Sequence, residues 1–214
     1  MAFEIALLAR PMTDPPSDLL EFLPLATRKR AKLFTSSTRL RDYYWARLLL
    51  CSILVRNNRR FHLVENPPQS PRVLEEDGSI FYYTTISHTG TYIGVAFSRN
   101  PVAIDLEVMK ARDTLDALFE RMFGAELLNA TPDSERLETF YRYWGLHESG
   151  VKLQGTFRCS NTEISLYDHA NRCVDYAHQV IDDNTILTIA GKLARDAHPR
   201  FYTTDEIESL LRAI

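Results

Sequence analysis

Two carboxylates, Asp105 and Glu107, are the first candidates for chemistry, because one residue separates them in a strand-like run from Val102 to Glu107. Side chains alternate between the two faces of a strand, so both acids should point to one face. Ile104 and Leu106 should then point to the opposite, buried face. Two interpretations stay open on this spacing alone: a solvated strand face, or a pair of acids that belongs to a site.

A third carboxylate, Glu148, lies in a segment with helical periodicity from about residue 133 to 154. It falls on the apolar stripe that contains Trp144 and Val151, where a carboxylate is costly unless it is paired or binds a metal. An ordinary ion pair with Lys152, one turn further on, is the simple alternative. Three converging acids would repel one another, and a hard cation such as Mg²⁺ would resolve that conflict.

Two glycines, Gly145 and Gly150, lie in the same helical segment. Each costs about 1 kcal/mol relative to alanine in a helix. They indicate that another part of the chain or a ligand approaches the helix closely.

The elements that must position these residues indicate an α+β fold of two similar halves, residues 1–101 and residues 102–214. The clearest helix is predicted at about residues 38 to 56, with one buried stripe. The short connection from Arg99 to Pro101 predicts a hairpin between the strand-like runs on either side of it.

Composition excludes several classes of function. The chain has 214 residues and a net charge of −3, so no global basic field suggests a nucleic-acid partner. No apolar stretch approaches the roughly 20 residues that span a bilayer. Three cysteines without a paired spacing favour a reduced, cytoplasmic protein.

Thr203 and Glu206 predict a capping box at the start of a last helix.

Three motifs occur in order along the chain: Ile86-Ser87-His88-Thr89, then Val102 to Glu107, then Trp144-Gly145-Leu146-His147-Glu148-Ser149-Gly150-Val151-Lys152. Together they resemble the core motifs of the 4′-phosphopantetheinyl transferases, of the monomeric, two-lobed type that includes the surfactin-synthetase-activating enzyme. The resemblance spans about residues 20 to 155. It implies two similar α/β lobes in a pseudo-twofold arrangement, antiparallel-rich sheets packed by helices, and an active site in the cleft between the lobes.

The resemblance also implies a reaction. The phosphopantetheine arm of coenzyme A would move to a serine of an apo acyl or peptidyl carrier protein, and adenosine 3′,5′-bisphosphate would leave. By position, Asp105, Glu107 and Glu148 would hold Mg²⁺. Glu148 would deprotonate the serine, and Lys152 would steady the pyrophosphate charge or protonate the leaving group. Coenzyme A contacts would come from Arg28, Arg30, Lys32, Arg72, Ser87, His88 and His147.

Several of these residues have simpler interpretations. Arg28 to Lys32 could be a solvated helix face, and His88 could bond backbone at a turn. Trp144 is expected in the core, and Arg47 is expected to be structural.

The main departure from the family pattern is His147, which stands where a lysine usually precedes the glutamate. We expect it to remain a phosphate contact, protonated by the pyrophosphate. The usual Gly-Lys-Pro element is replaced by Gln69-Ser70-Pro71, and Arg72 would supply the missing cation. An alternative function is therefore a catalytically weakened relative that binds coenzyme A or a carrier without efficient turnover.

Overall fold

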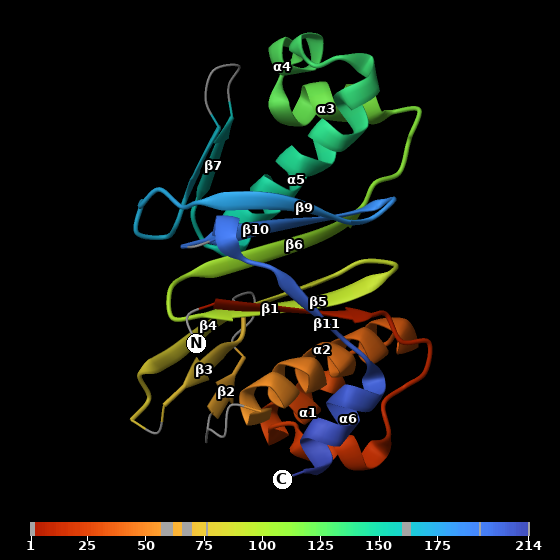
Figure 1. The fold of residues 1–214 in the computed structure, drawn as a ribbon, viewed down its shortest axis with the longest axis vertical. Coiled ribbons are helices and arrows are strands. Elements are labelled where there is room, and N and C mark those ends of the chain that lie inside the picture. The colour runs from red at the N-terminus through yellow and green to blue at the C-terminus, as the bar shows by residue number, and fades with distance from the viewer. Residues whose placement is uncertain are drawn as a thin grey trace. The chain divides into compact units, whose positions relative to one another are not determined.

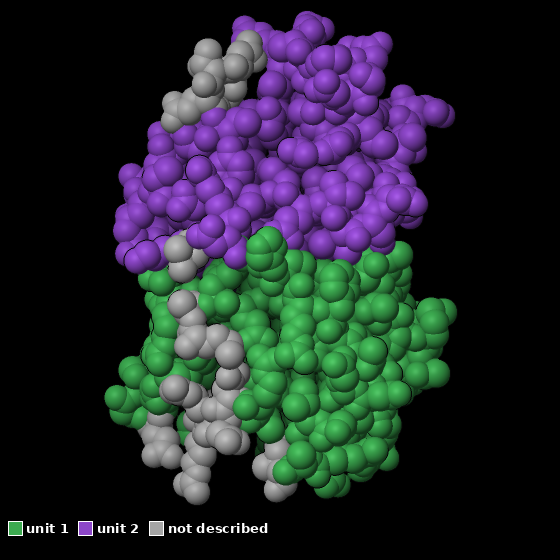
Figure 2. Space-filling model, in the orientation of Figure 1, with its two compact units in different colours: residues 1–100, 197–214 green, residues 101–196 purple. Residues whose placement is uncertain are grey.

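The computed structural model describes residues 3–56, 62–65, 70–75, 77–159, 164–192 and 194–213. They form two compact units, coloured separately in Figure 2: unit 1 contains residues 1–100 and 197–214, and unit 2 contains residues 101–196. The expected second half, residues 102–214, differs from unit 2 at its end. The last segment belongs to unit 1 because its strand pairs in parallel with the first strand of the chain.

Unit 1 is built on a six-stranded sheet in which only the pairing of β1 with β11 is parallel among the described strands. Its strands, in spatial order, are β11 (Pro199–Tyr202), β1 (Phe3–Ala9), β5 (Tyr92–Ser98), β4 (Ile80–His88), β3 (Arg72–Leu74) and β2 (His62–Val64). Arg72, which was expected to supply the missing cation, is the first residue of β3. Gln69 of the altered Gly-Lys-Pro element lies outside the described residues.

Helices cover one face of this sheet (Figure 1): η1 (Ser17–Phe22), α1 (Leu25–Ala31), α2 (Ser37–Arg56) and α6 (Thr204–Arg212). The long helix is confirmed, but the prediction of one buried stripe is wrong. Leu48, Leu49 and Leu50 are consecutive and all fully buried, because α2 is packed between the sheet and its neighbouring helices. The capping box of Thr203 and Glu206 at the start of α6 is confirmed.

Unit 2 contains a three-stranded antiparallel sheet in the order β6 (Val102–Val108), β10 (Thr185–Gly191) and β9 (Tyr176–Asp182). A separate pair is formed by β7 (Thr156–Cys159) and β8 (Ile164–Tyr167). The helices are α3 (Leu115–Phe123), α4 (Ala125–Ala130), η2 (Asp133–Glu135), α5 (Arg136–Lys152) and η3 (Ala194–Asp196). α5 packs against β6 and β10, as Figure 1 shows. The chain is therefore α+β with antiparallel-rich sheets.

The hairpin that we predicted across Arg99 to Pro101 is wrong. β5 pairs with β1 and β4 in unit 1, whereas β6 pairs with β10 in unit 2. The short connection therefore carries the chain from one sheet to another. Among the described residues, no helix is long and apolar enough to cross a membrane.

Candidate active site

The two strand acids lie where β6 runs beside β10. Asp105 pairs across the strands with Thr188, and Glu107 with Ile186, so the two acids share one face as predicted. Asp105 is only 5% exposed, and Glu107 is half-buried. The interpretation as a solvated strand face is therefore wrong for Asp105. A buried carboxylate requires a partner, because its desolvation is costly.

Lys152, at the end of α5, supplies that partner. Its Nζ donates to Asp105 Oδ1 at 2.7 Å and to the carbonyl oxygen of Ile104 at 2.8 Å. Lys152 thus joins α5 to β6, and both members of the pair belong to the sequence motifs. A buried pair of this kind holds its geometry, since removal of one partner would leave the other charge uncompensated.

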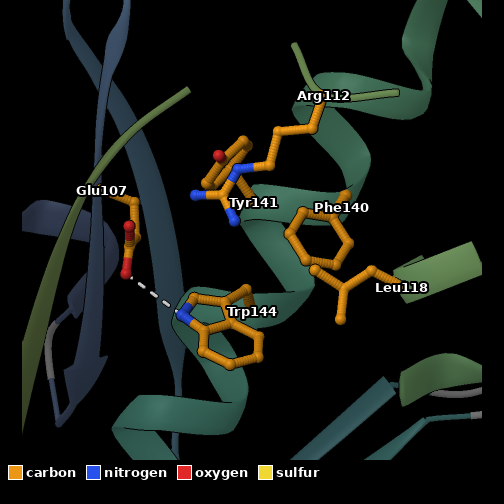
Figure 3. Close-up of a pocket in the computed structure, with 6 residues that line it drawn as sticks. All are labelled: Glu107, Arg112, Leu118, Phe140, Tyr141 and Trp144. Atoms are coloured by element: carbon orange, nitrogen blue, oxygen red, sulfur yellow. Dashed lines mark hydrogen bonds between the residues drawn. The ribbon is translucent and has the colours of Figure 1, made fainter. Parts of the chain in front are cut away.

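Glu107 is held by Trp144 of α5. The indole Nε1 donates to Glu107 Oε1 at 3.1 Å, the bond drawn in Figure 3. The ring also stacks on Phe140, with 23° between the planes. The expectation that Trp144 is only a core residue is incomplete, because its polar edge holds an acid of the site.

The charge around Glu107 indicates that the three acids approach one another. Burial and then the negative charge of Asp105 raise the pKa of Glu107 to about 7, and Glu148 adds to this rise. The bond from Trp144 and the charge of Lys152 oppose it. Glu148, half-buried on α5, therefore acts on the same space as the two strand acids.

The three carboxylates fit Mg²⁺ in chemistry, since oxygen donors and excess negative charge are what a hard cation requires. As placed, however, no group of three or more His, Cys, Asp or Glu side chains within the described ranges has the arrangement of a metal centre.

A cavity of about 150 Å³ opens beside Glu107 (Figure 3). Its wall is largely aromatic, and Arg112 from the segment before α3 reaches toward it next to Tyr141. The residues that line it are Glu107, Arg112, Leu118, Phe140, Tyr141 and Trp144. An acid, a cation and aromatic rings thus share one small space within unit 2.

Unit 1 contains a second cavity, of about 410 Å³, which we call the basic pocket. It is lined by four cationic or titratable basic side chains and two aromatic rings: Arg30, Phe34, Arg39, Tyr43, Arg47 and His88. Arg30 and His88 were predicted to contact a phosphate, and the structure places both in this pocket. Multiple arginines suit a phosphate, because guanidinium groups present planar sets of donors.

The other predicted contacts lie elsewhere. Arg28 is half-buried in α1 and Lys32 is exposed at its end, and the lining of the basic pocket includes neither. Arg72 is an exposed residue of β3, and Ser87 is buried next to His88 in β4.

His147, in α5, contacts the rings of Trp144 and Phe157. Its predicted contact with a phosphate stays a prediction.

Sequence reasoning missed several residues of the basic pocket. Arg39, Tyr43 and Arg47 recur every four residues along α2, and this spacing places them on one helix face. That signal was available in the sequence, but Arg47 was assigned a structural role. Glu65, which bonds to the arginines of the pocket, follows the short strand β2 and had no comparable sequence signal.

Three curated relatives are similar to the chain, although no protein-family model matches it. The 4′-phosphopantetheinyl transferase psf-1 of Bacillus pumilus is 24% identical over 192 residues, covering 78% of this chain and 81% of the relative. The 4′-phosphopantetheinyl transferase HetI of Nostoc sp. is 27% identical over 179 residues, covering 76% and 73%. The 4′-phosphopantetheinyl transferase ffp of Bacillus subtilis is 32% identical over 72 residues, about a third of each chain.

The structure thus combines an α+β fold, two acids on one face of β6, and Lys152 of α5 paired with one of them. Over most of its length the chain is similar to 4′-phosphopantetheinyl transferases.

Proposed function

We propose that this protein transfers the 4′-phosphopantetheine arm of coenzyme A to a serine of an apo acyl or peptidyl carrier protein, with release of adenosine 3′,5′-bisphosphate. One observation carries the proposal: the motif residues of β6 and α5 meet, with Lys152 on Asp105 and the charge of Glu148 acting on Glu107. The similarity to three 4′-phosphopantetheinyl transferases supports transfer of this arm.

The proposed roles follow from the chemistry of each side chain. Glu148 accepts the proton of the carrier serine, directly or through a water, as the serine oxygen attacks the β-phosphate. Lys152 steadies the charge that develops on the leaving phosphate or donates a proton to it. Positioning and charge neutralisation supply most of the catalysis in phosphoryl transfer, so these groups need little covalent chemistry.

Asp105, Glu107 and Glu148 are the proposed ligands of Mg²⁺. When bound, the cation would neutralise phosphate charge as a Lewis acid. The shared negative charge that raises the pKa of Glu107 supports this assignment, because a cation would relieve it.

The proposed coenzyme A contacts begin with Arg30 and His88 in the basic pocket, which suits the 3′-phosphate. Arg39 and Arg47 join them there, although the sequence did not single them out as contacts. Arg28, Lys32, Arg72, Ser87 and His147 stay in the proposal by motif position alone.

The wider setting is also proposed from the family resemblance. It comprises two pseudo-twofold lobes with the reaction between them, and a cytoplasmic monomer that acts without nucleic acid or membrane. The three free cysteines agree with a reducing compartment.

The direct test is a transfer assay with coenzyme A, Mg²⁺ and several purified apo carriers, followed by intact mass of the carrier. A gain of one phosphopantetheine arm supports the proposal. Coenzyme A binding without transfer to any carrier would instead favour the catalytically weakened relative.

The proposed metal site predicts that Asp105→Ala abolishes transfer. The variant removes a ligand and leaves Lys152 without its carboxylate. Asp168→Ala is the matched control, because Asp168 is equally buried and also paired, with Arg172 at a turn of unit 2. Full transfer by Asp105→Ala at low Mg²⁺ would remove the proposed site.

The phosphate role of His147 predicts that His147→Ala lowers coenzyme A affinity or turnover by about tenfold, as loss of a charge-assisted hydrogen bond does. Both constants are measured from the same transfer assay across pH 6 to 8. If neither changes, His147 packs only against Trp144 and Phe157.

A further inference from the structure

Glu65 is a buried carboxylate at the centre of the groups that form the basic pocket. Its side chain is only 3% exposed. Arg47 donates to both of its oxygens, from Nε at 3.1 Å and from Nη2 at 3.3 Å. Arg30 donates from Nη1 at 2.9 Å. One acid therefore fixes two arginines that come from different helices, α1 and α2.

An aromatic ring completes the cluster. The hydroxyl of Tyr43 lies 3.0 Å from Glu65 Oε2 and donates to it, and the guanidinium of Arg47 lies 3.8 Å from the centre of the same ring. Thr27 adds a hydroxyl donor to Oε1 at 3.2 Å. Burial alone would raise the pKa of Glu65, but the charges and bonds of Arg47, Tyr43 and Arg30 outweigh it and hold that pKa below its usual value. Glu65 is thus a fixed anion.

The hydrogen bonds to Glu65 leave donors for a ligand. A guanidinium carries five N–H donors in a rigid plane. Arg47 uses Nε and Nη2 toward Glu65, and Arg30 uses Nη1, so Arg47 Nη1 and Arg30 Nη2 are not committed to it. Both arginines line the basic pocket together with Arg39 and His88. An arginine held in one orientation binds a phosphate with less loss of side-chain entropy than a mobile one.

We propose that Glu65 is a positioning residue that orients Arg30 and Arg47 for a phosphomonoester in the basic pocket. For the 3′-phosphate of coenzyme A as its source, the proposal depends on the proposed function. The proposal predicts an effect on phosphate binding that is opposite to the effect of net charge alone. Removal of Glu65 adds positive charge to the pocket, which by Coulomb attraction alone would tighten phosphate binding. If orientation dominates, removal weakens binding instead.

The experiment measures binding of coenzyme A and of dephospho-coenzyme A by calorimetry, without turnover. The two ligands differ only in the 3′-phosphate. We expect Glu65→Gln to weaken coenzyme A binding by about tenfold, as loss of an orienting partner does, and dephospho-coenzyme A binding by less than about twofold. The native preference for coenzyme A should shrink accordingly.

Glu4→Gln is the matched control. Glu4 accepts from Arg56 at 2.6 and 2.8 Å and from the Tyr202 hydroxyl at 3.2 Å, so the variant breaks a similar Glu–Arg–Tyr cluster in the same unit. None of these residues lines the basic pocket. The control should leave the preference between the two ligands unchanged. Urea unfolding of each variant establishes that it is folded.

If Glu65→Gln does not fold, Tyr43→Phe decides, since it removes one donor to Glu65 and keeps the ring beneath Arg47. We expect Tyr43→Phe to reduce the preference for coenzyme A over dephospho-coenzyme A as well, but by less than Glu65→Gln does. An unchanged or larger preference in the folded variant overturns the proposal, as does a native protein that binds both ligands equally.

Failure of the proposed function is distinguishable from failure of this inference. If the protein transfers no arm but still prefers coenzyme A to dephospho-coenzyme A, the proposed function is rejected and the positioning role of Glu65 is not. If native protein binds neither nucleotide, titration with inorganic orthophosphate applies the same criterion. Weaker orthophosphate binding by Glu65→Gln supports the positioning role, and no binding by native protein overturns it.

Discussion

Trp144 shows how one side chain can serve both packing and a site. Its ring stacks on buried Phe140, which is the role that its apolar stripe predicts. Its indole N–H donates to Glu107, and periodicity carries no information about that bond. Sequence reasoning identified Asp105, Glu107, Glu148 and Lys152 as a set through the family motifs. It could not show that Lys152 pairs with Asp105, because that contact depends on how helix and strand pack.

Trp144→Phe should therefore impair the metal site while it keeps the packing. Phenylalanine preserves the stacked ring but removes the donor that holds Glu107. Loss of a partner that orients a metal ligand typically costs about 10–100-fold in metal affinity. We expect the Mg²⁺ concentration for half-maximal transfer to rise by about tenfold.

Trp45→Phe is the control for this change. Trp45 is buried in unit 1, and its indole also donates a hydrogen bond, to the Thr13 carbonyl at 2.9 Å. The Trp45→Phe variant should be less stable than the native protein but should need the same Mg²⁺ concentration for half-maximal transfer. In that background Trp144 is the sole tryptophan, so its fluorescence should respond to Mg²⁺ without any substrate. An unchanged Mg²⁺ requirement in Trp144→Phe would show that the indole only packs.

At the level of elements, the close approach that Gly145 and Gly150 indicated is confirmed. A Cβ at Gly145 would lie 2.1 Å from Thr188 Oγ1 of β10, so the bare backbone lets α5 sit against the sheet. At Gly150 the nearest atom would be the Phe157 nitrogen at 3.3 Å. Element types were predictable where periodicity was strong. Which strands pair with one another was not predictable, because strand pairing depends on residues far apart in the sequence. The wrongly predicted hairpin between β5 and β6 is an example.

Gly145→Ala should consequently destabilise unit 2. Alanine favours a helix by about 1 kcal/mol over glycine, but here its methyl group would also meet Thr188 Cβ at 2.8 Å. Overpacking of this kind typically costs about 1–3 kcal/mol. Because Thr188 lies across from Asp105, transfer should fall as well. Thermal or urea unfolding measures the first effect.

Gly90→Ala provides the comparison, since nothing lies within 4 Å of a Cβ at that position. Its free energy of unfolding should stay within about 0.5 kcal/mol of the native value. Equal stability of Gly145→Ala and the native protein would mean that α5 can shift away from β10 at little cost.

At the scale of the whole molecule, the sequence predicted the α+β class and a division near residue 100, but not the return of the chain end to unit 1. β11 is four residues long and pairs with the first strand, so its assignment depends on a contact across almost the entire chain. Local patterns do not encode such contacts. Groups outside the sequence motifs also affect the stability of the folded protein, and His178 is one of them.

His178 should make the protein less stable in mild acid. Burial, and then the charge of Arg142, lower the pKa of His178 from its ordinary value of 6.5 to about 4, and Glu138 opposes this shift. Its Nδ1 lies 3.0 Å from Thr188 Oγ1. Between pH 6.5 and 4 the unfolded chain binds a proton at this histidine and the folded chain does not. The stabilisation is therefore complete above pH 6.5 and declines as the pH falls toward 4.

The expected loss is on the order of 2 kcal/mol across that window. Urea unfolding of the native protein and of His178→Asn at several pH values measures it, and the difference between the two slopes isolates the histidine from the carboxylates. His169→Asn, at an exposed turn position of the same unit, should keep the native slope. Parallel slopes for the native protein and His178→Asn would mean that the folded protein protonates His178 as readily as the unfolded chain does. The surroundings of the His178 ring in β9 would then admit water in mild acid, and the contact with Thr188 would not keep the ring neutral.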